Sequence, residues 1–244
     1  MREDGSTGGD ALHPTRSAVG QMFDDIAPTY DLLNHLLSLG RDHSWRRRAA
    51  GLLDDRTLLR VADLATGTGD LLIAMLRRRP DIMRAAGLDI SERMLARCRE
   101  KLHRRGLGGR AELVCADASA TPFPDGEFDA VAMAFGIRNT SDPGATLREI
   151  HRILKPGGVA LVLEFSRPAN RVARWCHLKY LRFGVPFIGS FLSGDRHAYR
   201  YLNESIEEFC RTVDLPAHME RIGFRDVSVM PLTLGVASIY KGIK

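Results

Sequence analysis

Apolar residues along the chain alternate between short continuous runs and helically spaced patterns. Continuous runs of the kind that form buried strands occupy residues 59–65, 84–88, 111–115, 128–134 and 159–165. Apolar positions at helical spacing lie between them, at residues 71–79, 91–105 and 143–154. Strands that alternate with helices in this way predict a parallel sheet covered by helices on both faces.

Residues typical of helix starts and ends agree with these predicted element boundaries. Ser91 and the pair Asp142–Pro143 are typical of helix starts, and the run from Lys155 to Gly158 stops the third helix before the next strand. Ser205 and Glu208 have the spacing of a capping box, which predicts a helix from there to about Arg221.

The two ends of the chain differ from its middle. Residues 1–16 contain almost no apolar side chains and predict a disordered tail, whereas residues 19–53 carry apolar positions at helical spacing. The alternation breaks after Phe165, so residues 168–203 are predicted to form an inserted cap. Two last strands, at 224–231 and 234–240, follow and predict an antiparallel edge pair. We therefore expect one domain over 17–244, with a helical lid at 17–56.

Composition excludes several classes of protein. The 244 residues carry 35 Lys and Arg against 30 Asp and Glu, and this excess is dispersed rather than gathered into a basic run with aromatics, so nucleic acid is not an expected partner. The four cysteines lack zinc-ligand spacing, so no metal site is expected and a cytoplasmic protein is indicated. The sequence shows neither a signal peptide nor an apolar stretch long enough to cross a membrane.

The most informative segment runs from Asp63 to Asp70, where the first strand gives way to a helix. Gly67 and Gly69 let the backbone turn sharply beside a ligand, and Asp89, about 20 residues further on, stands where ribose hydroxyls are usually bound. A nucleoside-containing cofactor is therefore expected. The alternative is that Asp63, Asp89 and Asp117, at or near consecutive strand ends, are only helix caps and turn formers.

The same segment discriminates between two kinds of cofactor. A dinucleotide site requires a third glycine where this chain has Leu72, and Asp70 would place a negative charge beside a pyrophosphate. S-adenosylmethionine fits better because its sulfonium and ammonium groups are positive. Asp117, followed by Ala118, adds a carboxylate that could accept a hydrogen bond from an adenine amine.

From about Val19 to its C-terminus the chain resembles the ubiquinone/menaquinone-biosynthesis C-methyltransferases, a branch of the class I S-adenosylmethionine-dependent methyltransferases. The residues that carry the resemblance form these groups: Phe23, Asp24, Ile26, Ala27, Tyr30, Asp31 and Asn34; Leu37, Ser38, Gly40, Trp45 and Arg46; the loop from Asp63 to Asp70; Phe135, Gly136, Ile137, Arg138 and Asn139; Leu154, Lys155, Pro156, Gly157 and Gly158; Glu164, Phe165, Ser166 and Pro168; Tyr199, Tyr201, Leu202, Ser205 and Ile206. The resemblance implies a Rossmann-like, seven-stranded α/β fold.

By that resemblance, Thr68, Asp89 and the pair Asp117–Ala118 match positions that contact the cofactor, within a site that also includes Asp63, Ala65, Gly67 and Gly69. Two positions depart from the family pattern. Ala65 stands where many methyltransferases have a glycine, which is tolerable if its φ angle stays negative. Ala134 stands where some members carry a hydroxyl that touches the cofactor.

The reaction that the resemblance implies is methyl transfer to a ring carbon of a polyisoprenoid quinol, in the menaquinone or the ubiquinone pathway. We expect Arg138, which follows the fourth strand, to stabilise a developing phenolate and Asn139 to orient a ring hydroxyl. The alternative is a structural pair, with Arg138 bound to a helix end and Asn139 holding a turn. Other readings of the whole chain are methylation of a small phenolic or sterol-like metabolite, or a non-catalytic protein that binds S-adenosylmethionine.

Two further expectations concern the substrate. Tyr30, Tyr199 and Tyr201 are candidates to close over a flat quinol ring, with core packing as the alternative. Residues 172–194 mix aromatic and cationic side chains, as expected of a segment that lies on the inner face of a membrane. A lid buried against the domain or a homodimer contact would have the same pattern.

Overall fold

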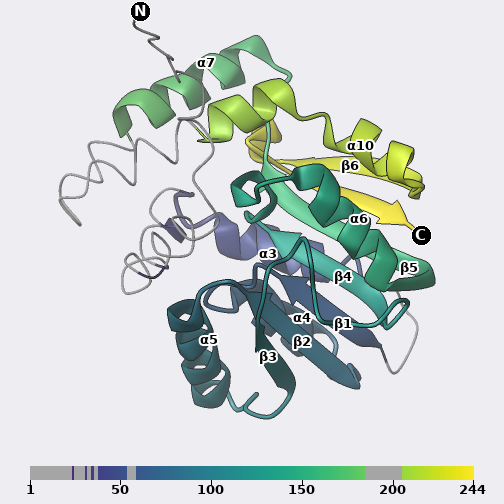
Figure 1. Ribbon diagram of the computed structural model, residues 1–244. Coiled ribbons are helices and arrows are strands. Elements are labelled where there is room, and N and C mark those ends of the chain that lie inside the picture. The colour runs from purple at the N-terminus through teal and green to yellow at the C-terminus, as the bar shows by residue number, and fades with distance from the viewer. Residues whose placement is uncertain (1–23, 25–30, 32–33, 36–37, 54–58, 185–204) are drawn as a thin grey trace, which may run out of the picture.

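The computed structural model describes residues 24, 31, 34–35, 38–53, 59–184 and 205–244. Within them, seven strands form one mixed sheet in the order β3-β2-β1-β4-β5-β7-β6 (Figure 1). The strands are β1 (Arg60–Leu64), β2 (Arg84–Asp89), β3 (Ala111–Cys115), β4 (Phe128–Ala134), β5 (Leu154–Phe165), β6 (Arg225–Leu232) and β7 (Ala237–Ile243). The first five run parallel, and β7 pairs antiparallel with both β5 and β6.

Helices connect the strands and pack on both faces of the sheet. They are α3 (Asp42–Ala50), α4 (Asp70–Arg78), α5 (Glu92–Arg104), α6 (Pro143–Ile153), α7 (Arg171–Lys179) and α10 (Leu215–Ile222). Short turns of tighter or wider helix lie at Ile137–Asn139, Tyr180–Gly184 and Thr233–Gly235, and residues 205–212 are also helical.

Successive residues of each central strand enter opposite halves of the core, as the two-residue period of a strand requires. Val61 packs with α3 and α4 on one face, and Ala62 packs with α6 and α10 on the other. The same alternation repeats in β4 and β5. Because both faces are covered, the central strands are mainly apolar, and the buried Asp63 and Glu164 are exceptions.

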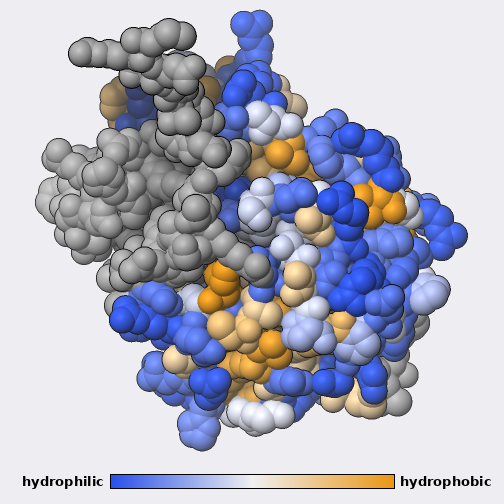
Figure 2. Space-filling view, viewed as in Figure 1, coloured by the Kyte–Doolittle hydropathy of each residue, from blue (hydrophilic) through white to orange (hydrophobic). Residues whose placement is uncertain are grey.

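The edge strand β3 is less covered, and its residues are half-buried or exposed. Figure 2 shows apolar side chains gathered on the part of this face where α5 and β3 lie in Figure 1, among mostly hydrophilic neighbours.

The predicted helix starts are confirmed. The Ser91 hydroxyl accepts a hydrogen bond from the Met94 amide, and the Asp142 carboxylate accepts one from the Ala145 amide ahead of Pro143. The expected antiparallel pair at the C-terminus is also present, as β6 and β7.

Two expected boundaries are wrong. The single helix expected from Ser205 to Arg221 is divided, because Asp214 caps a new helix whose first turn contains Pro216, a residue that cannot continue the preceding hydrogen-bonded turn. In addition, β5 begins at Leu154, directly after α6. Residues 155–158, expected to separate helix from strand, are thus part of the strand.

The helical lid and the inserted cap stay predictions. Helix α3 lies in the expected lid and α7 in the expected cap, but much of 17–56 and residues 185–204 lie outside the described residues. Among the residues that the structure describes, there is no helix with the length and apolarity that crossing a membrane requires.

Candidate active site

The carboxyl ends of the five parallel strands meet at one edge of the sheet, the edge at which open α/β sheets bind ligands. Four segments of interest leave the sheet there. They are the loop 65–69 after β1, Asp89 at the end of β2, the turn that contains Asp117 after β3, and residues 135–139 after β4. The topology therefore brings together the cofactor residues and the catalytic pair expected from the sequence.

Asp63 shapes the loop after β1 from within the protein. It is 1% exposed, and its Oδ2 accepts hydrogen bonds from the Thr66 hydroxyl (2.7 Å) and the Leu72 amide (3.1 Å). Its Oδ1 is buried without a hydrogen-bond partner among the described residues. Burial, opposed by those hydrogen bonds, raises the pKa of the Asp63 carboxyl to about 7. An uncompensated carboxyl in this place suits a ligand with positive charge.

The loop itself contains a strained alanine. Ala65 has a φ angle of +50°, so the expectation that this angle stays negative is wrong. The reason lies in the turn that follows β1, where the Thr66 amide must reach the Leu88 carbonyl of β2 (2.9 Å). Gly136 lies against Ala65, and a Cβ atom at position 136 would approach the Ala65 Cβ to 2.6 Å. The segment after β4 and the loop after β1 are thus in direct contact.

Gly69 is required for a different close approach. It adopts a φ of +87°, and a Cβ atom there would lie 2.4 Å from the sulfur of Cys98 on α5. Burial raises the pKa of the Cys98 thiol to about 12, so this cysteine remains a neutral packing residue. It lets α5 approach the start of α4.

Asp89 links the loop to the second strand. Its Oδ2 accepts a hydrogen bond from the Gly67 amide (2.7 Å) and its Oδ1 accepts one from the Ser91 amide (3.0 Å). Burial raises the pKa of this carboxyl, against the effect of both amides. A carboxylate has about four acceptor sites, so Asp89 keeps capacity for ribose hydroxyls after these two bonds.

Thr68 takes part in a cluster that sequence reasoning missed. Lys101 on α5 donates to the Thr68 hydroxyl (2.8 Å) and to Asp70 (2.7 Å), and it pairs with Asp31 at 2.6 Å. Thr68 also donates to Asp31. The charge of Asp70, expected to face the ligand, is thus balanced by Lys101. Three segments far apart in sequence are joined here, and no spacing rule in the sequence signals it.

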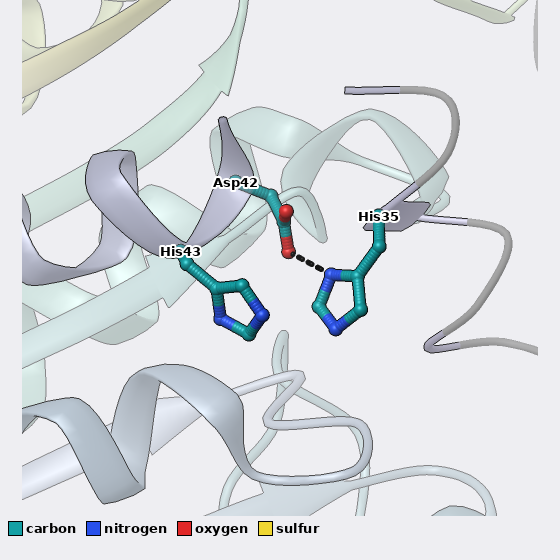
Figure 3. A group of neighbouring side chains, drawn as sticks. All are labelled: His35, Asp42 and His43. Atoms are coloured by element: carbon teal, nitrogen blue, oxygen red, sulfur yellow. Dashed lines mark hydrogen bonds and ion pairs between the residues drawn. The ribbon is translucent and has the colours of Figure 1, made fainter. Parts of the chain in front are cut away.

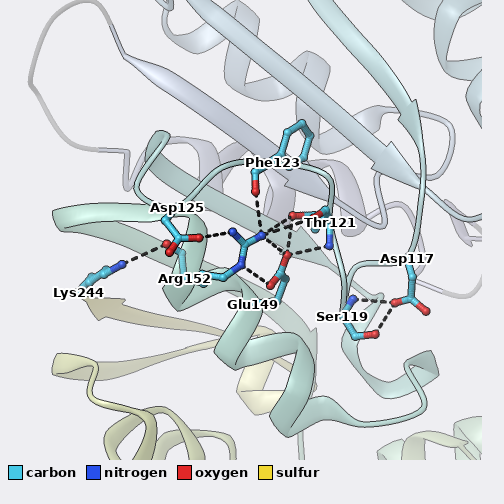
Figure 4. Close-up of polar contacts among 8 residues, drawn as sticks. All are labelled: Asp117, Ser119, Thr121, Phe123, Asp125, Glu149, Arg152 and Lys244. Carbon is cyan, nitrogen blue, oxygen red and sulfur yellow. Dashed lines mark hydrogen bonds and ion pairs between the residues drawn. The ribbon is translucent and has the colours of Figure 1, made fainter.

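Asp117 is held in a tight turn. Its Oδ1 accepts from the Ser119 amide (2.6 Å) and hydroxyl (2.7 Å) (Figure 4). Beyond this turn, Glu149 of α6 accepts from the amide and hydroxyl of Thr121, and Arg152 donates to the Phe123 carbonyl (2.8 Å). This second network fixes the chain that follows Asp117 and the buried Ala118.

Arg138 lies on a short turn directly after β4. Its Nη1 donates to Glu164 Oε1 (2.8 Å) and to the Phe135 carbonyl (2.8 Å), and its Nε is buried with no hydrogen-bond partner among the described residues. Asn139 donates to the same carbonyl at 3.3 Å. The partner of Arg138 is therefore the buried Glu164 of β5, not the helix end that formed the alternative. Glu164 could be noticed in the sequence as a charged residue in an otherwise apolar strand.

Aromatic rings line the region beside this pair. Phe165 lies 4.8 Å from Phe135 and 6.4 Å from Trp45, measured between ring centroids, and the Arg138 guanidinium lies 5.3 Å from the Phe165 centroid. The Trp45 indole also donates to the Thr233 hydroxyl at 2.9 Å, which ties α3 to the end of β6. Flat apolar surfaces and one cation thus stand together next to the cofactor loop.

His35, Asp42 and His43 form a group whose nitrogen and oxygen atoms lie within 4.8 Å of one another (Figure 3). The His35 ring lies 2.8 Å from Asp42, measured from Nδ1 to Oδ2. That carboxylate also pairs with Arg46 and accepts from Ser38, and these partners lower its pKa although burial opposes them. Because a metal ion would face the Arg46 guanidinium, we assign no metal to this group.

The remaining candidates cannot be placed in the same way. Tyr30, Tyr199 and Tyr201 lie outside the described residues. Their role over the quinol ring stays a prediction. The donor set that is described fits S-adenosylmethionine, because it combines the buried Asp63 carboxyl, whose Oδ1 has no hydrogen-bond partner among the described residues, with a second carboxylate at Asp89 that retains acceptor capacity.

Comparison with known proteins agrees with this chemistry. The sequence model described as the ubiE/COQ5 methyltransferase family matches residues 11–244. A demethylmenaquinone methyltransferase of Thermus thermophilus is 47% identical over 221 residues, which are 91% of this chain and 99% of the relative. A ubiquinone/menaquinone biosynthesis C-methyltransferase, UbiE, of Geobacter sulfurreducens is 42% identical over 226 residues, 93% of this chain and 88% of the relative. The resemblance drawn from the sequence motifs is confirmed.

Solved structures extend the comparison to the fold. A methyltransferase from Aquifex aeolicus, described as SAM-dependent, superposes with a TM-score of 0.61 at 18% identity, over 87% of this chain and 97% of that one. The [4+2]-cyclase SpnF superposes with a TM-score of 0.61 at 20% identity, over 97% and 99%. The predicted Rossmann-like class I fold is thus confirmed. Since one of these neighbours is a cyclase, the fold alone does not fix the reaction.

Proposed function

The chain belongs to the ubiE/COQ5 methyltransferase family, and from that premise we propose that it uses S-adenosylmethionine to methylate a ring carbon of a polyprenylated quinol, demethylmenaquinol or its ubiquinone-pathway counterpart. The observation that carries the proposal is the contact between Ala65 and Gly136. It joins the loop expected to hold the methyl donor to the segment that presents Arg138.

Several residues would hold the cofactor. The Asp89 carboxylate would accept the ribose hydroxyls, Asp63 would supply negative charge below the loop, and Asp117 with Ala118 would border the adenine. When bound, S-adenosylmethionine supplies a methyl group on a positively charged sulfur, which a carbon nucleophile can take. The glycine loop and the turn after β4 would then face the two reactants.

The chemical role of Arg138 follows from its unpartnered Nε. A ring carbon becomes nucleophilic when the neighbouring phenol loses its proton, and for a Tyr-like phenol this ionisation costs about 4 kcal/mol at pH 7. A donor aimed at the oxygen lowers that cost, because the negative charge develops next to a fixed cation. A guanidinium does not give up its proton in proteins, so Arg138 stabilises the phenolate and is not the base that creates it.

Positioning contributes more than this electrostatic effect. Alignment of a ring carbon with a methyl group can contribute about 7–11 kcal/mol. The half-buried Phe165, backed by the buried rings of Phe135 and Trp45, would present a rigid aromatic surface to a flat quinol, and Asn139 would orient a ring hydroxyl. The residues of this chain would therefore act mainly by orientation.

We also propose contact with the inner face of a membrane through α7, since a polyisoprenoid quinol resides in the bilayer. Val172, Trp175 and Phe183 are 70%, 62% and 59% exposed. Lys179 lies 5.9 Å from the Trp175 ring and 5.2 Å from the Phe183 ring. The segment 171–184 contains no acidic residue. Exposed aromatics with cations and no acids are typical of interfacial helices. A homodimer contact through α7 is the competing proposal.

The test of the proposed function is mass spectrometry of quinones from a cell that lacks this protein. We expect a quinone lighter by one CH₂ group to accumulate, and the gene for the intact chain to restore the full mass. Unchanged quinones would favour methylation of another phenolic or sterol-like metabolite, or a non-catalytic protein that binds the cofactor.

A further inference from the structure

A hollow of about 490 Å³ lies between α7, the residues that follow β5, and the helical residues 205–212. Among the residues that line it are Pro168, His177, Leu178, Ile206 and Cys210, and we refer to it as the α7 hollow. Figure 1 shows α7 beside the yellow-green helix that contains residues 205–212. Its size falls within the range of about 300–1,000 Å³ that is usual for small-molecule sites.

The inner end of the α7 hollow lies next to the proposed reaction centre. The Cys210 thiol is directed at the Phe165 carbonyl (3.7 Å), and the Phe165 ring lies against the Arg138 guanidinium. Burial raises the pKa of the Cys210 thiol to about 11, and the nearby Glu164 charge adds to this effect. The ion pair between Arg138 and Glu164 therefore lies close to the side of the hollow that Cys210 lines.

The α7 hollow also borders the exposed apolar face of α7. Leu178 lines the hollow and is also 43% exposed, one helical turn from the exposed Trp175. The hollow therefore connects two places that the proposed function already requires. One is the ring site at Arg138, and the other is the helix that we place against a membrane.

Most of the surface that lines the hollow is apolar, although five of the residues along it, Arg167, Arg174, Glu207, Glu208 and Arg211, are charged. Burial lowers the pKa of His177 below its ordinary value, so the ring is mostly neutral at pH 7, and its buried Nε2 has no hydrogen-bond partner in the part of the chain that the structure describes. Arg174 donates to the Pro168 carbonyl (3.0 Å), and Arg211 pairs with Glu208 (2.7 Å). The other charged members, Arg167 and Glu207, are of opposite sign.

We propose that the α7 hollow receives the isoprene units next to the quinol ring, and that the rest of the tail passes Leu178 toward the bilayer. This inference rests on the proposed function. It adds a specificity site for the tail that is separate from the ring site. A tail bound there would hold the ring at Arg138 while most of the isoprenoid stays in lipid.

The first test fills the hollow and compares two substrates. Kinetics would be measured for Leu178→Trp and Ile206→Trp with a prenylated demethyl quinol and with the same ring without a tail. We expect KM for the prenylated quinol to rise about tenfold or more, since loss of only two buried CH₂ groups has that effect, and the kinetics of the tailless ring to stay unchanged. Val229→Trp is the matched control, because Val229 lies on β6 outside this hollow and is 45% exposed.

Leu178→Trp keeps the test decisive if the buried Ile206 tolerates no change, because Leu178 is partly exposed. An unchanged KM for the prenylated quinol in a folded Leu178→Trp variant would overturn the inference, as would equal losses for both substrates. Absence of methyl transfer by the unchanged protein to either quinol would instead overturn the proposed function.

A second measurement does not depend on turnover. A quinone whose first isoprene unit carries a photoreactive diazirine would be bound to the unchanged protein, irradiated and mapped by peptide mass spectrometry. We expect attachment to peptides that contain Leu178, Ile206 or Cys210. Attachment confined to other parts of the chain would contradict the assignment.

Discussion

The Glu164 carboxylate holds one side of the Arg138 guanidinium, and the Nε on the other side has no hydrogen-bond partner among the described residues. Nη1 and Oε1 are 2.8 Å apart, with the side chains 7% and 0% exposed. Glu164 Oε1 also accepts from the Phe165 amide at 2.9 Å, so the carboxylate is itself fixed by the strand. A buried cation is thereby compensated on one side and keeps an unused donor on the other.

Glu164→Gln should lower both stability and turnover. The variant leaves the buried guanidinium without a counter-charge, and removal of one partner of a buried pair costs about 3–5 kcal/mol. Denaturant unfolding would measure the loss of stability. The folded fraction should turn over more slowly with unchanged cofactor affinity. Arg138→Lys, which keeps the charge but loses the planar fork, should have the same kinetic effect.

Glu100→Gln is the control for this prediction, because Glu100 forms an exposed ion pair with Arg104. Such a pair contributes about 0–1 kcal/mol. If both Glu164→Gln and Arg138→Lys turn over as fast as the unchanged protein, the ion pair has a purely structural role.

Asp89→Ala should weaken S-adenosylmethionine binding. Each hydrogen bond to a charged group contributes about 1.5–3 kcal/mol, and the variant removes those to ribose. The variant also releases the Gly67 amide, so calorimetric titration must be accompanied by a folding check. Unchanged affinity in a folded Asp89→Ala protein would show that the ribose lies elsewhere.

Asp63→Asn should alter the pH dependence of stability. The folded pKa of Asp63, about 7, lies above the unfolded value of about 4, so the folded state disfavours the charged form. Stability of the unchanged, cofactor-free protein should therefore fall as pH rises from about 4 through 7, by an amount of the order of 3 kcal/mol between about pH 5 and pH 8. Asparagine does not titrate, so this part of the decline should be absent from Asp63→Asn. Denaturant unfolding of both proteins at both pH values would measure the difference. An identical decline in both proteins would refute the assignment.

Ala65→Gly should stabilise the protein or leave it unchanged. A non-glycine residue in the left-handed region costs roughly 1–2 kcal/mol, which glycine avoids at some cost in unfolded-state entropy. Ala62→Gly is the control, because Ala62 is buried in the extended backbone of the preceding strand β1, and this variant should lose about 1 kcal/mol or more of stability. Equal destabilisation by both changes would contradict the strain that we assign to Ala65.

The proposed membrane contact predicts reversible binding to vesicles of anionic phospholipid, weakened by salt. The double variant Trp175→Ser with Phe183→Ser should sediment less with such vesicles. Met83→Ser, at an apolar residue 57% exposed just before β2, should not change binding because it lies at the opposite edge of the sheet. An unchanged protein that fails to bind at low salt would remove the membrane contact and favour the homodimer alternative.

The sequence predicts the order of strands and helices because apolar periodicity and capping residues such as Ser91 and Asp142 act locally. It does not predict the break at Asp214, where a Pro in the next turn overrides a helical pattern. It also does not predict the positive φ of Ala65, which a hydrogen bond to the neighbouring strand imposes. Local patterns hold no information about such cross-strand constraints.

For the candidate site, too, local sequence patterns predict some features and miss those that depend on tertiary neighbours. Asp63 and Asp89 lie at the carboxyl ends of strands and Arg138 follows one, so all three could be assigned to one edge of the sheet from their positions alone. The partners Glu164 and Lys101 could not, because they depend on β5 lying next to β4 and on α5 packing beside the start of α4. Tertiary neighbours therefore decide whether a charged residue is balanced or available.

The central claim is that this chain transfers a methyl group from S-adenosylmethionine to a quinol ring carbon. The most direct measurement combines the purified protein, methyl-labelled S-adenosylmethionine and a prenylated demethylmenaquinol, with the product analysed by mass spectrometry and NMR. The account predicts label on the ring carbon, with much less in Arg138→Lys. Cofactor binding without any label on the quinol would contradict it.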